Sequence, residues 1–380
     1  MKTENVKGFN DYTGAEALKR AEIKKVIEDV FGRYSFEPAE TPVVEYEEFV
    51  KGENEKDEAV SDIFKLQDKG KRKLALRYEF TFQLKRIMKD KKLPYKRYSI
   101  GPVFRDEPTS GGKARFRQFT QCDADIIGSD IKDEAEVLSV ALEIFKGLGV
   151  KPVILFNNRA LLNEILEDNE VKEKDKEFVL REIDKYDKLP EKEVKNNLKK
   201  FKAEKVLDAL KKGESYFKKF ESYKNVISLI EYCKLYGVKI VLAPTVIRGL
   251  SYYNGSVFEI KKEGMKETLV AGGSYEFNGV QCTGISFGLE RIALVAKVKE
   301  EKEKYLVISL EQDREAVKIA NKLREKDKAV SVYYGKPSKA LEYANSYCFK
   351  KVVFVGSREV KAKKFKIKDM DSGKDFALKL

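Results

Sequence analysis

The sequence predicts an α+β protein that ends in a small α/β domain. Two sheet-like runs, KRYSIGPVFRDE (96–107) and ARFRQFTQCDADIIG (114–128), flank a charged loop, which indicates paired strands. Residues 159–236 are instead dense in Lys and Glu with helical spacing, and they predict a charged helical insertion. From Tyr305 onward, strand-like apolar runs alternate with helical patterns, which favours a mostly parallel sheet.

Before the insertion, the pattern predicts a helix, several strands and further helices. Residues 14–33 are amphipathic and should form a helix, while the chain over 35–49, which holds Pro38 and Pro42, should be extended. The apolar face of that helix consists of Ile23, Val26, Ile27, Val30 and Phe31. Strands are expected at 63–68 and 73–81, a helix near 82–90, the two strands around the loop, a helix at 134–150 and a strand at 151–158.

After the insertion, a second sheet region and a C-terminal domain follow. Strands are expected at 238–244, 256–264, 267–275 and 283–288, and then a helix over 289–304. The last part should contain strands at 305–310, 329–334 and 351–356, helices at 313–326 and 336–350, and a final β-hairpin. These changes of pattern divide the chain into 1–158, 159–236, 237–300 and 301–380.

The charge of the chain leaves two interpretations open. The net charge is +13 and the isoelectric point about 9.1. Residues 301–380 hold 20 Lys and Arg against 12 Asp and Glu, a net charge of +8, so the excess is concentrated there. A polyanionic partner such as RNA fits this distribution. Lysine that only solvates helices would produce the same total.

The lack of histidine and of closely spaced cysteines limits the catalytic and metal-binding chemistry that the chain can perform. The chain contains no histidine, which excludes Ser/His and Cys/His nucleophile pairs and imidazole metal ligands. The four cysteines are far apart, so neither a zinc site nor a disulfide framework is predicted, and a reducing compartment is expected. We find no apolar signal segment and no run long enough for a membrane span. The sequence therefore predicts a cytoplasmic protein without membrane contact or bound metal.

Alternation along residues 117–125 places a polar row on one side of a strand. Arg117, Phe119, Gln121, Asp123 and Asp125 share that face, which either lines a polar pocket or faces solvent.

Arginines gather around the loop that precedes this strand. Arg105, Arg115 and Arg117 belong to one hairpin, and the planar guanidinium group matches phosphate oxygens in a bidentate way. Such a hairpin either holds a nucleoside phosphate or is a charged tip.

Three further segments supply candidate residues. Arg291 falls in the first turn of a helix, where the dipole disfavours a cation unless an anion binds there. LRYEFT carries Glu79 and Thr81 on one face of an expected strand, and RGLSYYN carries an arginine and a tyrosine pair. Carboxylates, amides and tyrosine hydroxyls at these positions could receive an ammonium group or a ring N–H, although core packing would also explain the tyrosines.

Taken together, these segments resemble class II aminoacyl-tRNA synthetases, and specifically the histidyl-tRNA synthetase family in its archaeal and eukaryotic branch. The class pattern FRxE…RxxxFxxxD matches FRDE and RFRQFTQCD, and the GLER pattern matches GLERIAL. The family string RGLDYY appears as RGLSYY, and QCDADIIG is similar to the QCDxDIxG form. The resemblance covers essentially the whole chain.

The resemblance implies an antiparallel sheet flanked by helices, a dimer formed around Pro42, a helical insertion and an anticodon-binding α/β domain. It implies that L-histidine and ATP, with Mg²⁺, form histidyl-adenylate and that the histidyl group passes to the 3′ end of tRNA(His). The residues it assigns to ATP are Arg105, Glu107, Arg115, Phe119 and Arg291. Those it assigns to histidine are Glu79, Phe80, Thr81, Arg105, Gln121, Asp125, Arg248, Tyr252, Tyr253 and Tyr275, of which Arg105 and Arg248 also act in catalysis.

The chain departs from the family pattern at three positions. Ser251 stands where aspartate is usual, Ser274 where arginine is usual, and Phe277 where glycine is usual. Two alternatives to an active enzyme remain: a non-charging paralogue such as the regulatory subunit of ATP phosphoribosyltransferase, and an RNA-binding module derived from a synthetase.

Overall fold

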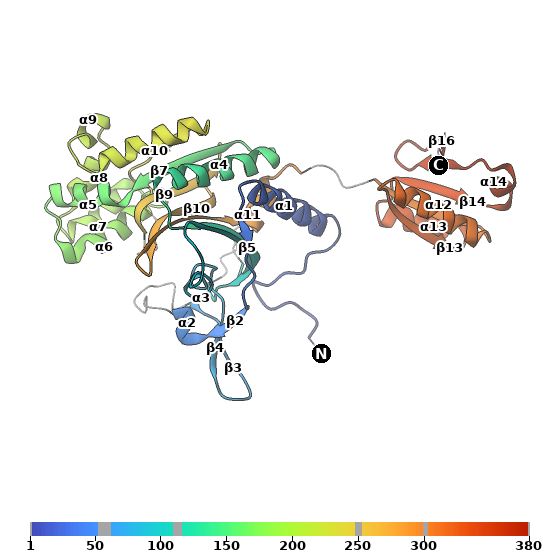
Figure 1. Cartoon of the computed structure of the whole chain (residues 1–380), viewed down its shortest axis with the longest axis horizontal. Coiled ribbons are helices and arrows are strands. Elements are labelled where there is room, and N and C mark those ends of the chain that lie inside the picture. The colour runs from blue at the N-terminus through green and yellow to red at the C-terminus, as the bar shows by residue number, and fades with distance from the viewer. Residues whose placement is uncertain (1, 52–61, 109–115, 248–252, 299–302, 379–380) are drawn as a thin grey trace. The chain divides into compact units, whose positions relative to one another are not determined.

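The computed structural model describes residues 2–51, 62–108, 116–247, 253–298 and 303–378. The chain forms two compact units, Met1–Val298 and Lys299–Leu380. Figure 1 shows both units with their helices and strands labelled. Within the described residues, no helix has the length and apolar character needed to cross a membrane.

An eight-stranded sheet forms the centre of the first unit, in the order β1-β5-β6-β11-β10-β9-β7-β8. The six inner strands are antiparallel to their neighbours, and the edge strands β1 and β8 run parallel to β5 and β7. In this order, the strands span Glu37–Pro38, Tyr95–Phe104, Gln118–Ile127, Val280–Gly288, Thr268–Phe277, Tyr253–Lys262, Pro152–Asn158 and Ile240–Leu242. The expected antiparallel sheet is confirmed, with one parallel strand added at each edge.

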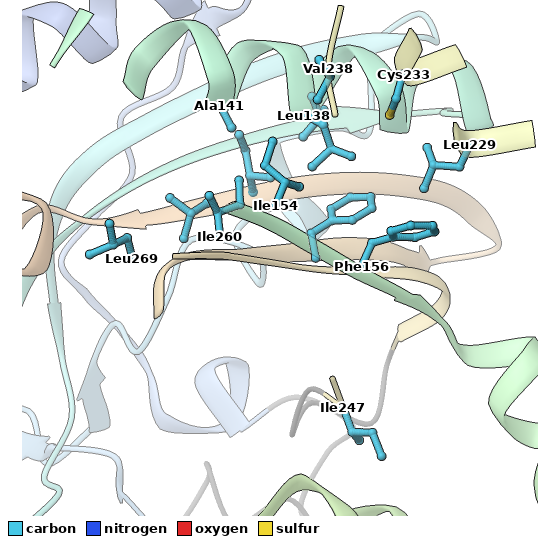
Figure 2. Close-up of a cluster of buried hydrophobic side chains, with 14 of the residues drawn as sticks. Leu138, Ala141, Ile154, Phe156, Leu229, Cys233, Val238, Ile247, Ile260 and Leu269 are labelled. Carbon is cyan, nitrogen blue, oxygen red and sulfur yellow. The ribbon is translucent and has the colours of Figure 1, made fainter. Parts of the chain in front are cut away.

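Helices cover one face of this sheet and close the core. They are α1 (Gly14–Arg33), α4 (Ile131–Gly147), α11 (Leu289–Val295) and, from the insertion, α10 (Tyr223–Leu235). Phe287 of β11 packs between Phe31 of α1 and Phe145 of α4, with ring centroids 6.1 and 6.2 Å away. Figure 2 shows side chains of α4 and α10 above those of β7 and β9 in the same core. The other face of the sheet carries the polar residues of β6 and a smaller apolar cluster that includes Ile127 and Tyr275.

The insertion joins β7 to β8 and is helical, as predicted. Its own apolar residues, among them Val179, Leu198 and Leu207, belong to the same continuous core. Its elements are α5 (Arg159–Asp168), α6 (Glu173–Ile183), the 3₁₀ turn η2 (Asp184–Asp187), α7 (Glu191–Lys199), α8 (Glu204–Leu210), α9 (Glu214–Phe217) and α10.

A small sheet of order β2-β4-β3 precedes the central strands. Its strands are β2 (Val44–Tyr46), β4 (Lys73–Leu76) and β3 (Lys65–Gln67), and two short helices, α2 (Glu47–Lys51) and α3 (Leu84–Ile87), adjoin it. The predicted strand over 73–81 was too long, since β4 ends at Leu76. Arg77 still donates its N–H to the Val43 carbonyl, but its own carbonyl accepts from Phe104 and its guanidinium bonds to the carbonyls of Thr41 and Pro102.

The second unit contains a five-stranded sheet of order β13-β12-β14-β15-β16. The first three strands are parallel, as expected, and the last two form the predicted hairpin. Alternate residues of β12 pack against α12 on one face and α13 on the other. Its elements are β12 (Lys304–Ser309), α12 (Asp313–Glu325), β13 (Ala329–Tyr334), α13 (Pro337–Ser346), β14 (Lys351–Val355), α14 (Ser357–Ala362), β15 (Lys366–Asp369) and β16 (Asp375–Ala377).

Two expected helices are much shorter in the structure, and two of the described helices were not expected. The helix predicted over 289–304 ends at Val295, because Ala296 is extended and Lys297 donates its N–H to the Leu148 carbonyl. The helix near 82–90 is only the four residues of α3. Two elements, α2 and α14, lie where extended chain or a hairpin was predicted. These short helices carry too few apolar positions for a periodic signal.

Candidate active site

The polar face of β6 forms the floor of the candidate site. Cys122, Ala124 and Ile126 of this strand belong to the hydrophobic core under α1 and α4. The residues between them, Asp123 and Asp125, therefore point to the opposite face, and both carboxyl groups are buried. The predicted alternation is confirmed. Arg117 lies one residue before the strand, which begins at Gln118.

Asp125 is the centre of a buried network. The guanidinium Nη2 of Arg97, opposite Asp125 on β5, lies 2.6 Å from its Oδ2. The hydroxyl of Tyr275 donates to Oδ1 at 2.6 Å. Burial raises the pKa of the Tyr275 hydroxyl well above its ordinary value, and the charge of Asp125 adds to the effect. Gly284 makes room for this carboxylate, since a Cβ there would lie 2.2 Å from Oδ1.

Arg97 is the residue that sequence reasoning missed. Its side chain is fully buried, and its Nη2 also donates to the Phe80 carbonyl at 3.0 Å. It therefore connects Asp125 to the segment that follows β4. Two of its nitrogen atoms, Nε and Nη1, are buried without a hydrogen-bond partner. The only signal in the sequence was an arginine near the start of a sheet-like run.

Glu79 reaches this site from the chain after β4, so its predicted place on a strand, together with Thr81, was wrong. Its carboxyl group is buried, and no described residue forms a hydrogen bond with its Oε1. Burial raises the pKa of Glu79 to about 7, against the lowering effect of Arg105. The neighbouring Phe80 is buried, and its ring packs against the Arg77 guanidinium, 4.6 Å from the ring centroid.

Arg105 and Phe119 lie together at the hairpin end of the site. The Arg105 guanidinium carbon is 4.3 Å from the centroid of the Tyr78 ring and 5.1 Å from that of Phe119. Its Nε is buried without a partner. Arg117, in contrast, is held by the hairpin itself, because it bonds to the Glu107 carbonyl at 3.2 Å and lies 3.3 Å from the Asp106 carboxylate. Arg105 is thus the better placed of the two to meet an anion.

Gln121 and Asp123 complete the polar row. The Gln121 amide donates to Ser286 at 2.8 Å, and its Oε1 is buried without a hydrogen-bond partner in the part of the chain that the structure describes. Burial raises the pKa of Asp123 to about 7, while hydrogen bonding to Ser286 lowers it. Among the described residues, the three buried acids, Glu79, Asp123 and Asp125, have two arginines, Arg97 and Arg105, as counter-charges. The excess of negative charge suits a cationic ligand.

Glu290, next to the predicted ATP residue, has a structural contact. Its carboxylate accepts the Thr120 N–H at 3.0 Å and an Arg20 Nη2 bond at 2.8 Å. It thereby ties α11 to β6 and α1. Arg291 lies in the first turn of α11 as predicted, is exposed, and donates to the Thr268 carbonyl at 2.9 Å.

The remaining candidates divide into two groups. Tyr253 begins β9 and packs with the cluster that contains Tyr275. Arg115, Arg248 and Tyr252, like the departure Ser251, lie outside the described residues. No group of acids and cysteines suited to holding a metal ion is present in the part of the chain that the structure describes.

The other two departures lie around the site rather than in it. Ser274, between Gly273 and Tyr275 on β10, turns away from Asp125 and donates its hydroxyl to Glu134 of α4. Burial raises the pKa of Glu134 to about 7, and hydrogen bonds from Ser256 and Ser274 act in the opposite direction. Phe277 packs in the apolar cluster of Leu84 and Tyr275.

We expect the Arg97–Asp125 pair to be essential for stability. Arg97→Met leaves a buried carboxylate without its counter-charge and should lower the free energy of unfolding by about 3–5 kcal/mol. The double variant Arg97→Met/Asp125→Asn should recover part of this loss, because the charge is then gone. Urea unfolding followed by circular dichroism measures both. Lys96→Met, which removes a partly exposed pair with Glu136 from the same strand, is the control. A loss no larger than that of the control contradicts the prediction.

Comparison with known proteins identifies the family. The profile described as "Histidyl-tRNA synthetase" matches residues 8–292. "Histidine--tRNA ligase 1" of Bacillus cereus (strain ATCC 10987) is 32% identical, over 100% of this chain and 96% of that protein. "Histidine--tRNA ligase" of Nanoarchaeum equitans is 34% identical, over 93% and 91% of the two chains.

Solved structures agree with this assignment at the level of the fold. The histidyl-tRNA synthetase of Nostoc sp. PCC 7120 superposes with a TM-score of 0.85 at 24% identity, covering 100% of this chain and 97% of that one. A structure from Bacillus halodurans, titled an ATP phosphoribosyltransferase regulatory subunit/histidyl-tRNA synthetase, has a TM-score of 0.79 at 19% identity and covers 93% and 98%. The polar face of β6, the helical insertion and these matches lead to one conclusion: the chain belongs to the histidyl-tRNA synthetase family of aminoacyl-tRNA synthetases.

Proposed function

We propose that the chain activates L-histidine with Mg²⁺-bound ATP and transfers the histidyl group to the 3′ end of tRNA(His). The observation that carries the proposal is the convergence of buried acceptors with one accessible cation. Within the described ranges, Glu79 and Gln121 each have a buried oxygen without a hydrogen-bond partner, beside Asp125, and Arg105 lies next to Phe119 at the hairpin end. An amino acid with a cationic end and a nucleotide with an anionic one fit such a site.

In this proposal, the acids bind the amino acid. The α-ammonium group supplies three donors, which Glu79 and Gln121 receive. The imidazole N–H donates to Asp125, whose two oxygens each keep a further lone pair beyond the bonds to Arg97 and Tyr275. Because Asp125 is buried, an amino acid with an apolar side chain would leave unpaired the acceptor that Asp125 offers to the imidazole, and it should bind more weakly. Tyr253 and the sequence candidates Thr81, Phe80 and Tyr252 complete this pocket in the proposal.

Arg105 acts on the phosphate. Its guanidinium holds the α-phosphate and the histidine carboxylate together, so that a carboxylate oxygen attacks phosphorus while the bond to pyrophosphate breaks. The adenine stacks on Phe119. We assign the remaining phosphate contacts to Glu107, Arg115 and Arg291, and charge stabilisation at the α-phosphate to Arg248, on the family pattern. Mg²⁺ arrives with ATP and offsets its phosphate charge.

Histidine-dependent exchange of pyrophosphate into ATP tests the first step. The full chain should exchange with histidine and Mg²⁺, and not with other amino acids or with excess chelator. Arg105→Ala should lower kcat/KM at least roughly hundredfold, since it removes a charge that contacts the reacting phosphate. Arg33→Ala, which removes a surface pair with Glu143, is the matched control. Binding of histidine without any exchange would instead favour the regulatory-subunit alternative.

The second unit supplies the proposed contact with tRNA. Its net charge is +8, and Tyr347 of the turn after α13 is 59% exposed while its ring packs at a tilt against Tyr343, with 4.6 Å between the centroids. Tyr334 on β13 is 58% exposed. Exposed rings next to lysines are suited to stack on unpaired bases, as in an anticodon loop.

Tyr347→Ala should raise the KM for tRNA roughly tenfold, by the usual energy of one base–aromatic stack. Pyrophosphate exchange should stay unchanged, because this step needs no tRNA. Val317→Ala, on α12 and hence on the opposite face of the unit, serves as the control. Equal effects of the two variants on aminoacylation would argue against a tRNA contact at Tyr347.

We also propose a homodimer, through the small sheet beside Pro42. Val43, Val44, Tyr46 and Leu66 of this region are exposed apolar residues, a pattern typical of contact surfaces. Sedimentation equilibrium should give twice the 43.6 kDa of one chain, and Val44→Lys should shift it towards the monomer. A wild-type monomer at micromolar concentration contradicts the dimer.

We also propose that the activity is cytoplasmic, as its substrates are, which cell fractionation would test.

A further inference from the structure

We propose that Ser286 and Asp123 are positioning residues that fix the side-chain amide of Gln121, so that its oxygen faces the ammonium group of the substrate. The inference rests on the proposed function. The three residues lie on neighbouring strands, Gln121 and Asp123 on β6 and Ser286 on β11, directly opposite Asp123. Gln121 Nε2 donates to Ser286 Oγ at 2.8 Å, and Ser286 Oγ donates to Asp123 Oδ1 at 2.5 Å.

Which group donates in each of these two hydrogen bonds follows from the protons that the three side chains carry. An ionised carboxylate can only accept hydrogen bonds, and a serine hydroxyl has one proton. Because Ser286 gives its proton to Asp123, it can only accept from Gln121. Gln121 must therefore turn its NH₂ group towards Ser286 and its oxygen away. A free amide could present either end, whereas this one has a single favourable orientation.

The oxygen that results is available for a ligand. Gln121 Oε1 is buried and has no hydrogen-bond partner among the described residues, and the same holds for Glu79 Oε1. Buried acceptors of this kind cost free energy until a donor reaches them. The charge of Asp123 acts on Glu79, which indicates that the two acids belong to one site. A primary ammonium group can donate to both oxygens at once.

The charge state of Asp123 is coupled to this arrangement. Burial raises its pKa to about 7, and the groups that act on it are Ser286, Arg97 and Arg105, which lower the pKa, and Asp125, which raises it. A protonated Asp123 could donate to Ser286. Ser286 would then donate to the Gln121 oxygen, so that both hydrogen bonds are reversed and the Gln121 NH₂ group turns towards the ligand. A cationic ligand favours the ionised form, so its binding selects the productive direction.

The test compares two histidine analogues, one with and one without the ammonium group. Histidinol keeps the ammonium and lacks the carboxylate, whereas 3-(imidazol-4-yl)propanoate keeps the carboxylate and lacks the ammonium. Ser286→Ala removes the acceptor that orients the amide. We expect the affinity for histidine and histidinol to fall roughly tenfold to hundredfold, the usual effect of losing a hydrogen bond to a charged group. The affinity for the propanoate should change less than about twofold, because it makes no such bond.

Two further variants make the result specific. Ser286→Thr keeps the hydroxyl and should keep histidinol affinity within about threefold of wild type. Ser99→Ala is the matched control, since Ser99 is a buried serine opposite Asp123 on its other side, on β5, and donates instead to the Ala39 carbonyl. It should leave the ratio of the two affinities unchanged. Titration calorimetry on the full chain measures all of them.

The outcomes separate the inference from the proposed function. Equal losses for histidinol and the propanoate in Ser286→Ala, or no loss for either, overturn the inference while histidine binding by the wild type stands. A wild-type chain that binds neither histidine nor histidinol refutes the proposed function, and the inference with it. In pyrophosphate exchange, the inference further expects a raised KM for histidine with an unchanged KM for ATP.

Discussion

The alternation of side chains along β6 is the constraint on which both the core and the site depend. Cys122, Ala124 and Ile126 anchor the sheet to α1 and α4, and this places Asp123 and Asp125 on the opposite face. A shift of one residue in register would exchange the two faces and put two carboxylates under the helices. The pairing of β6 with β5 on one side and β11 on the other prevents this shift.

Burial of acids behind this sheet makes the site electrostatically demanding. A carboxylate removed from water needs a counter-charge or a donor, and Asp125 obtains both from Arg97 and Tyr275. Glu79 and Asp123 are less well compensated, and the pKa of each is raised to about 7 by burial. A cationic ligand supplies the missing charge, so binding and protonation are linked in this site. Because the charges of Glu79 and Asp123 are only partly compensated within the protein, these acids can interact with a cationic substrate.

The departures from the family pattern are easier to interpret with the structure in hand. Ser274 lies on the helix-covered face of β10, where its hydroxyl donates a hydrogen bond to Glu134. Phe277 extends an apolar cluster beneath Tyr275. Neither side chain hydrogen-bonds to the acids of the β6 row in the contacts described above. Both departures therefore affect residues that pack around the pocket and not the polar groups inside it.

The sequence alone predicted the fold class, the helix at 14–33, the helical insertion and the two faces of β6, because each depends on short-range periodicity. It also supplied the family strings. It did not predict Arg97 as the partner of Asp125, the place of Glu79 after β4, or Ser286 between Gln121 and Asp123. Each of these contacts depends on strand register or on a chain reversal, and Ser286 lies more than 160 residues from its partners. Local pattern fixes which face a side chain takes; only the packed sheet decides which residue it meets there.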